Sequence, residues 1–405
     1  MNRNNCYVAI SVAFFVMMLF QTAIALEDHG TNNSIPFCGG HKVIPIQPGQ
    51  KIVHIYEKIS PKSREHIDFN HFTCYYDTEE DLDGDGIPND IDYVTKVGTS
   101  LDNAWEYYTS ILGFREPPDS NIEVLVTHIP GPTQGETITY YNPDNYAVIS
   151  IEMRIDAEMD DEELDTVCGH EVFHAVQDAY DFLEPNWVTE GTAVWAQDEY
   201  NDDENDMWVS WANDYLQDPD RTLIDIDDDG DGRAGEDGPD GEDNDRDGNI
   251  DEDPDTGLSY NAVLFYKYIS ENYGVDIIRE MYENMNMPEA DAVNALETAT
   301  GNTFEKIFLG WLIMNYIAQW QDDGAVNLRE VTLYDGTLNP IIFDGTRRTI
   351  TTDVNPWAAD YIKIISTAEN MRIDFDGDDS SDFIVKVLLI SDCGCFGDFE
   401  IRLDN

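Results

Sequence analysis

The chain has 405 residues and a formal net charge of −61, from 83 Asp and Glu against 22 Lys and Arg. This balance excludes a nucleic-acid-binding protein, because so few basic side chains cannot neutralise a row of phosphates. It also argues against binding to an anionic membrane surface. Hydrophobic residues at 41% and aromatic residues at 11% are sufficient for a folded core. We therefore expect a globular protein with an acidic surface.

Residues 1–25 have the pattern of a secretory signal peptide. The basic Arg3 precedes an apolar run, and the small residues Ala23 and Ala25 stand at the −3 and −1 positions of a cut before Leu26. An uncleaved N-terminal anchor is the alternative, since the run is nearly long enough to span a bilayer. The sequence predicts a secreted, extracellular protein without stable membrane insertion after signal cleavage.

Export permits disulfide bonds. Cys6 would leave with the signal, and position along the chain favours Cys38 and Cys74 as a pair among the five cysteines that remain. Cys168 lies on the apolar face of an expected helix, where we expect a buried small hydrophobic residue rather than a nucleophile.

Residues 26–92 are expected to form a small N-terminal region that ends in a calcium-binding loop. Segment 81–92 has EF-hand-type spacing, with Gly86 at the sharp turn and Asp92 at the last ligand position. EF-hand loops usually have a Glu at that position, and its longer side chain binds the ion through both oxygens. The shorter Asp92 therefore puts the affinity for calcium in doubt. An acidic turn without an ion is the alternative. The predicted calcium ligands are Asp81, Asp83, Asp85, Ile87, Asn89 and Asp92.

A second acidic segment, residues 225–255, is dominated by Asp, Glu and Gly and contains two further calcium-type spacings. Without ions, so many carboxylates would repel one another and leave the segment disordered. A solvated acidic insertion is the alternative. The candidate calcium ligands are Asp227, Asp229, Asp231, Asp243, Asp245, Asp247, Asn249 and Asp251.

The chemistry is expected on a helix from about 160 to 180, which contains the HExxH motif His-Glu-Val-Phe-His. Residues four apart share one face of a helix, so His170 and His174 can reach one zinc ion. Glu171 lies beside them, in reach of a metal-bound water.

A catalytic zinc site uses three protein ligands and a water, so a third ligand is required. A His at metzincin spacing is excluded, because Gln177 and Tyr180 stand at the corresponding positions. Glu190 is the candidate, in the first turns of a helix expected from about 187 to 200, and Gly191 would let that helix approach the first one closely. The alternative for Glu190 is an ordinary first-turn carboxylate favoured by the helix dipole.

The segments HEVFHAVQ and WVTEGTAVWAQDE together resemble the gluzincin branch of the zinc metallopeptidases. The calcium loop and the helix ending AWEYYTSILGF are similar to secreted microbial metalloproteases with the same catalytic core. The resemblance covers about residues 80–320. It implies His170, His174 and Glu190 as zinc ligands and Glu171 as the general base.

The sequence departs from the family pattern at one position. Thermolysin-like members have an acidic residue one turn after the Glu ligand, and that residue orients a zinc-bound His. Here Val194 stands there. The orienting partner is therefore open, with Asp198 and Asp165 as candidates.

We expect an α+β fold with a zincin-like metallopeptidase domain over residues 93–322, including four helical patterns between about 260 and 320. A β-sandwich-like domain is expected over residues 323–405, where strands alternate. The strand at 147–152 is a candidate for binding an extended substrate by strand addition.

The predicted function is hydrolysis of peptide bonds in a protein or peptide substrate by a zinc-activated water, with Glu171 as general base and Ca²⁺ as a structural ion. Tyr260 or Tyr266 is the candidate second stabiliser of the oxyanion, and packing in the helical subdomain is the alternative for both. The alternative function is a calcium-dependent extracellular binding protein with a vestigial zinc site.

Overall fold

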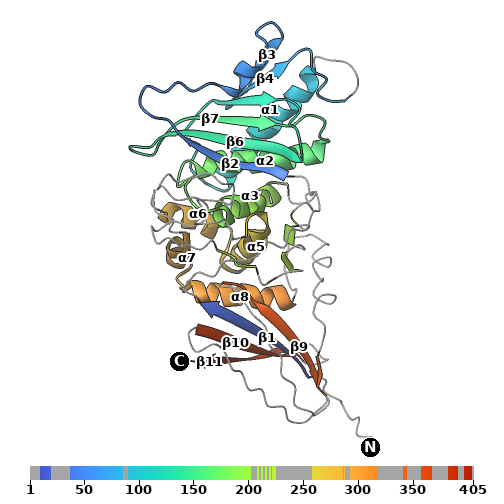
Figure 1. The fold of residues 1–405 in the computed structure, drawn as a ribbon, viewed down its shortest axis with the longest axis vertical. Helices are drawn as coiled ribbons and strands as arrows, with labels where there is room; N and C mark the ends of the chain where they lie inside the picture. The colour runs from blue at the N-terminus through green and yellow to red at the C-terminus, as the bar shows by residue number, and fades with distance from the viewer. Residues whose placement is uncertain are drawn as a thin grey trace, which may run out of the picture.

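The fold is mixed α+β, as the sequence predicts (Figure 1). Two sheets lie toward the ends of the long axis, and most of the helices lie between them. The computed structural model describes residues 10–19, 37–84, 90–201, 208, 211–212, 215–216, 219, 221–224, 258–285, 287, 292–317, 341–343, 357–366, 382–390 and 396–403.

The larger sheet has six strands in the order β2-β6-β7-β5-β4-β3. Strands β6 and β7 are antiparallel, whereas β2 runs parallel to β6 and forms the edge beside it. Strands from both sides of residue 92 enter this sheet, so the boundary predicted there does not separate two structural units. The strands are β2 (Phe37–Pro45), β3 (Arg64–Asp68), β4 (Phe72–Asp77), β5 (Ile122–Val126), β6 (Thr133–Asn142) and β7 (Ala147–Ile155).

The two faces of this sheet carry different side chains because successive residues of a strand point to opposite sides. On β7, Ile151, Met153 and Ile155 belong to the large core that includes α1 and α2. The opposite face packs a smaller cluster around Ile55, Leu125, Ile138 and Tyr140. The HExxH motif on α2 therefore lies under one face only.

Three helices pack on or next to the larger core. They are α1 (Ile91–Glu106), extended by a π-helical turn (Tyr107–Ile111), α2 (Asp161–Gln177) and α3 (Asn186–Tyr200). Helix α2 begins where the Asp160 side chain accepts a hydrogen bond from the Glu163 N–H, 3.0 Å away. Three acidic residues in its first turn, 161–163, stabilise the helix by interacting with the positive end of its dipole. The helix that contains the HExxH motif thus begins where the sequence predicts, near residue 160.

Helices after residue 258 form the layer beyond α3 (Figure 1). They confirm the four predicted helical patterns, and α5 ends at Gly274, whose φ of +99° favours glycine. None of the helices in the described part of the chain is both long and apolar enough to span a bilayer. The elements are a 3-10 turn (Tyr260–Ala262), α5 (Val263–Tyr273), α6 (Asp276–Asn284), α7 (Ala292–Thr300) and α8 (Phe304–Ile317).

The second sheet has the order β11-β10-β1-β9-β8. Its strands are β1 (Ile10–Leu19), β8 (Ile341–Phe343), β9 (Asp360–Ser366), β10 (Asp382–Ile390) and β11 (Phe396–Leu403). The expected β-rich C-terminal region thus supplies four strands to one sheet, and the described residues contain no second sheet facing it, as a β-sandwich would. The apolar run of the predicted signal peptide forms β1, antiparallel to both β9 and β10.

The predicted Cys38–Cys74 disulfide is wrong, because Cys74 is a free, buried thiol. Cys38 lies on β2 and Cys74 on β4, four strands across the sheet. Neighbouring strands are about 4.8 Å apart, so these strands are separated by about 19 Å. A disulfide requires Cα atoms within about 7 Å. Cys168 is buried with its thiol free, as expected for a small hydrophobic residue.

Candidate metal centre

Helices α2 and α3 bring two imidazoles and one carboxylate to a single point. Nε2 of His170 lies 3.0 Å from Nε2 of His174 and 3.1 Å from Oε2 of Glu190. The distance from Nε2 of His174 to the same carboxylate oxygen is 3.5 Å. Ligand atoms about 2.1 Å from a tetrahedral zinc ion lie about 3.4 Å from one another. The three atoms therefore have the mutual spacing of a tetrahedral ligand set.

Two glutamines, which the sequence reasoning missed, orient the two imidazoles. Nδ1 of His174 lies 2.8 Å from Oε1 of Gln177, and Nδ1 of His170 lies 2.9 Å from Oε1 of Gln197. Gln177 donates from Nε2 to the carbonyl oxygen of Thr189, 2.7 Å away. A carbonyl only accepts, so the amide oxygen of Gln177 must face the imidazole. His174 therefore carries its proton on Nδ1 and directs the lone pair of Nε2 into the centre.

The two acidic candidates for this orienting role are wrong. Asp198 forms a buried ion pair with Lys267 on α5, and Asp165 accepts a hydrogen bond from the Ser100 hydroxyl at 2.5 Å. Both carboxylates are engaged by other helices. Neutral amides replace them at the imidazoles, which leaves Glu190 as the carboxylate that offsets the charge of a bound cation.

The electrostatics of the centre favour a positive charge between these groups. Burial raises the pKa of Glu190, but His174 and His170 outweigh burial and hold that pKa well below its usual range. Burial lowers the pKa of His174, yet the charge and hydrogen bond of Glu190 raise it to about 9. Two lone pairs 3.0 Å apart repel each other unless a cation lies between them. A proton or a metal ion between the two nitrogens would remove this repulsion.

Glu171 lies between the centre and strand β6. Its Oε2 accepts a hydrogen bond from the Thr137 hydroxyl at 2.7 Å, and its Oε1 is buried without a hydrogen-bond partner among the described residues. Burial raises the pKa of Glu171 to about 8. A Cβ at Gly135 would lie 2.6 Å from Oε1, so only glycine leaves room for the carboxylate here. The strand thus holds one oxygen and leaves the other available.

The structure adds a third histidine from strand β2. The His41 N–H donates to Oε1 of Glu190 at 3.1 Å, and its ring stacks on that of His174 with centroids 5.1 Å apart. Nε2 of His41 lies 2.9 Å from the Thr139 hydroxyl and 3.2 Å from Asp178. Its Nδ1 is buried without a hydrogen-bond partner in the described part of the chain. Sequence reasoning missed His41 because it lies about 130 residues before the motif.

The two tyrosine candidates lie in different surroundings. The Tyr260 ring stacks on His170 with centroids 5.7 Å apart, directly beside the centre. The Tyr266 ring stacks on Trp187 at 6.1 Å and packs against Gly191, so its contacts are those of a core residue and do not support an oxyanion role. Gly191 itself faces Ala262 and Tyr266 rather than α2, which corrects the helix that it was expected to approach.

The residues of the metal centre are buried. The exposed fractions of His170, Glu171 and His174 are 0%, and that of Glu190 is 3%. The strand predicted at 147–152 is part of β7, which has β6 on one side and β5 on the other. The pairing with β5 begins only at Glu152, so residues 147–151 have no strand partner on that side among the described residues, and strand addition there stays a prediction. The edge next to α2 is formed by β2.

The predicted calcium loop is described only in part. Carboxylate oxygens of Asp81 and Asp83 lie within 4.8 Å of each other and of Asp90, which sequence reasoning did not select. Asp90 is buried and accepts a hydrogen bond from the Leu82 N–H. Asp92, on α1, is exposed and is not a member of this group. The other predicted ligands lie outside the described residues: Asp85, Ile87, Asn89, Asp227, Asp229, Asp231, Asp243, Asp245, Asp247, Asn249 and Asp251.

One more group of metal-binding residue types lies on the opposite face of the sheet. Nδ1 of His54 lies 2.6 Å from Glu152 and 2.8 Å from Glu123. The second oxygen of Glu152 accepts hydrogen bonds from the Ile55 N–H at 3.3 Å and the Tyr140 hydroxyl at 3.2 Å. These are hydrogen-bond lengths, so an ion pair accounts for the group without a metal.

Comparisons with known proteins do not identify the function of the chain. No family model matches the chain, and no curated protein matches it. Among solved structures the chain is similar to a functionally unknown conserved protein from Bacillus anthracis str. Ames. The identity is 9% over 98% of this chain and 92% of that chain, with a TM-score of 0.31, too low to carry an argument.

Proposed function

We propose that the chain is a zinc-dependent peptidase with a zincin-like core of the gluzincin type. The convergence of Nε2 of His170, Nε2 of His174 and Oε2 of Glu190, 3.0 to 3.5 Å apart, carries this proposal. Two nitrogens and one carboxylate oxygen form a ligand set typical of catalytic zinc, which keeps a further position for water. The orienting amides of Gln177 and Gln197 support the same assignment.

The proposed division of labour follows from the contacts of each residue. Zinc, when bound, would supply acidity to water and polarise the substrate carbonyl. Glu171 accepts the proton of the attacking water on Oε1 and delivers it to the leaving amine. Thr137 fixes the other oxygen, so the proton moves on one defined atom. The stacking of the Tyr260 ring on His170 supports the Tyr260 hydroxyl as the candidate stabiliser of the oxyanion.

We propose secretion and a structural role for Ca²⁺ as further parts of this function. The composition supports a soluble extracellular protein that acts on protein or peptide substrates. The group of Asp81, Asp83 and Asp90 supports a calcium ion in front of α1, since hard cations take carboxylate oxygens. Such an ion would fix the start of the helix that packs on α2.

Activity of purified protein tests the proposal. The full chain, loaded with zinc, is incubated with an unfolded protein substrate before and after treatment with a zinc chelator. We expect the intact chain to hydrolyse the substrate slowly, because the centre is buried, and we expect the chelator to stop this hydrolysis and Glu171→Gln to abolish it while zinc stays bound. Glu162→Gln, on the exposed first turn of the same helix, is the matched control and should keep the rate. Unchanged hydrolysis in Glu171→Gln would refute the role of the base.

The alternative, a calcium-dependent binding protein with a vestigial zinc site, is favoured by one observation. The centre is closed to solvent, as its exposed fractions of 0 to 3% require. A vestigial site that does not catalyse hydrolysis, however, would not require a buried Glu171 with one carboxylate oxygen that makes no hydrogen bond to the described residues. A zinc-loaded protein that hydrolyses nothing in either its intact form or the cleaved form described below would favour the alternative.

A further inference from the structure

We propose that strand β2 is an inhibitory segment of the chain itself, which covers the metal centre until a cut in the exposed turn after it allows the strand to leave. The inference rests on the proposed function and adds its regulation. It accounts for a peptidase-type centre whose ligands and base are at most 3% exposed.

Strand β2 occupies one edge of the larger sheet. It pairs with β6 and lies at the edge, where β6 would otherwise present free backbone groups. On the face of β6 that is directed toward α2, the Thr137 hydroxyl donates a hydrogen bond to Glu171. The edge of β6 that β2 occupies therefore lies next to the metal centre. An extended polypeptide binds a sheet by adding to such an edge. While β2 is there, no other strand can pair with this edge of β6; the other edge is paired with β7.

Strand β2 also contacts two of the proposed zinc ligands. The His41 N–H holds the Glu190 oxygen that does not face the imidazoles, and the His41 ring covers one face of the His174 ring. Thr139 and Asp178 fix the far side of the His41 ring at 2.9 and 3.2 Å. The side chain of His41 is 2% exposed, so it closes the centre on this side.

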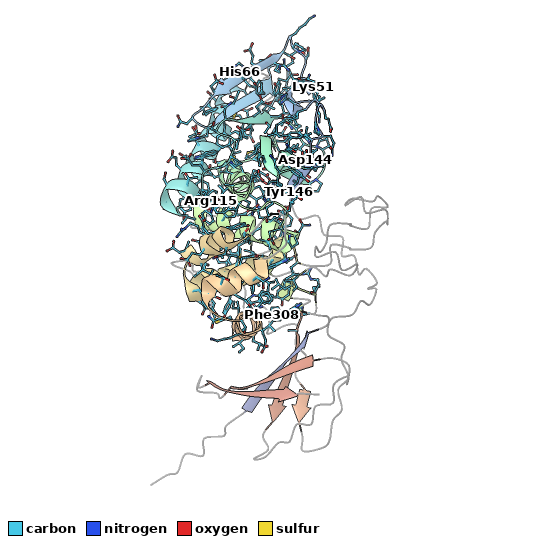
Figure 2. The ribbon with its side chains drawn as sticks, turned by 90° about the vertical axis from the view of Figure 1, so that its left-hand side faces the viewer. Lys51, His66, Arg115, Asp144, Tyr146 and Phe308 are labelled. Atoms are coloured by element: carbon cyan, nitrogen blue, oxygen red, sulfur yellow. The ribbon has the colours of Figure 1, made fainter. Side chains whose placement is uncertain are left out.

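The segment that follows β2 is an exposed turn. Gln47 to Gln50 form a turn closed by a backbone hydrogen bond of 2.9 Å, with Gly49 at a φ of +87°. All of its residues are exposed, and the side chain of Lys51 is 79% exposed at the molecular surface (Figure 2). Exposed turns of this kind are preferred sites of proteolysis.

The cut is hydrolysis of the peptide bond after Lys51 by a separate peptidase with specificity for basic residues. One water adds across the bond, giving a carboxylate on Lys51 and an amine on Ile52. Before the cut, covalent linkage keeps β2 at a high effective concentration next to β6. After it, and after the predicted signal cleavage before Leu26 that removes β1, only the pairing of β2 with β6 holds the fragment, and an extended substrate can compete for the edge. In a chain that keeps residues 1–25, β1 also holds the fragment by pairing with β9 and β10.

The test uses the full chain with the recognition sequence of a site-specific protease replacing residues 47–50. A recognition sequence with one changed residue, which that protease cannot cut, is the matched control. Two quantities are measured before and after cleavage and removal of the N-terminal fragment: the rate of zinc loss to a chelator and the rate of hydrolysis of an unfolded protein. We expect both rates to rise at least tenfold in the cleavable chain and neither in the control.

The two readouts separate failure of this inference from failure of the proposed function. Faster zinc loss without any hydrolysis would support the covering role of β2 and refute the peptidase. Equal zinc-loss and hydrolysis rates before and after fragment removal would overturn the covering role. A fall in hydrolysis after removal would also overturn it, because His41 would then be a positioning residue that the centre requires.

Discussion

The amide oxygen of Gln177 lies 2.8 Å from Nδ1 of His174, one helical turn away on the same helix, and sets which ring nitrogen faces the metal centre. Removing this acceptor should weaken zinc binding. We expect Gln177→Met, which keeps the volume, to lower zinc affinity about 10- to 100-fold. Competition with a zinc-binding dye measures this. Gln50→Met, in an exposed turn, is the control, and equal affinities in the two variants would contradict the orienting role.

Gly135 makes room for the carboxylate of Glu171. A Cβ there would lie 2.6 Å from Oε1 of Glu171 and 2.8 Å from Cγ1 of Val167. Gly135→Ala should therefore displace the proposed base, with a loss of hydrolysis on the order of 100-fold. Zinc content should not change, since none of the three ligands moves. Thr137→Ser keeps the hydroxyl that binds Glu171 and should keep most of the rate; a Gly135→Ala protein of full activity would refute this account.

Gly191 sets how closely α3 approaches α5. A Cβ there would lie 2.8 Å from Cβ of Ala262 and 2.9 Å from the Tyr266 ring. We expect Gly191→Ala to lower the free energy of unfolding by about 1–3 kcal/mol through overpacking. The double variant with Tyr266→Leu should recover part of this loss, because the smaller side chain can move aside. Denaturant unfolding measures both, and strictly additive effects would show that the two residues do not compete for space.

Asp90 is the buried member of the acidic group at the calcium loop. Calcium should raise the midpoint of thermal unfolding of the wild-type chain, because an ion offsets the repulsion between Asp81, Asp83 and Asp90. We expect Asp90→Ala to lose most of this shift. Asp92→Ala, at the exposed position that the loop spacing selects, tests the two assignments against each other. A shift that disappears in Asp92→Ala but not in Asp90→Ala would favour the original spacing.

Helical periodicity and a local motif made α2, α3 and the later helices predictable, because their signals lie within a few turns of sequence. The proposed ligands His170, His174 and Glu190 belong to that predictable part. Strand β6 was missed, since Gly135 and the two threonines on its inner face give it a polar pattern. Those residues serve Glu171 and His41 rather than the core.

Other parts of the site depend on contacts that are distant in the chain. His41 reaches the centre only because β2 pairs with β6, and no local pattern indicates that pairing. Gln197 and Gln177 carry no recognisable metal-site signal, because a neutral amide is an unremarkable residue on a helix. The wrong Cys38–Cys74 pairing has the same origin, since strand order across a sheet cannot be read from positions along the chain.

The central claim is that two imidazoles and one carboxylate hold one zinc ion, and metal analysis tests it most directly. The wild-type chain, His174→Ala and Glu190→Ala are purified with equal exposure to zinc and measured by mass spectrometry of the metal, with Glu162→Ala as a control on the exposed side of α2. We predict about one zinc per chain in the wild type and the control, and a loss of most of it in both ligand variants. Full zinc content in both ligand variants would contradict the account.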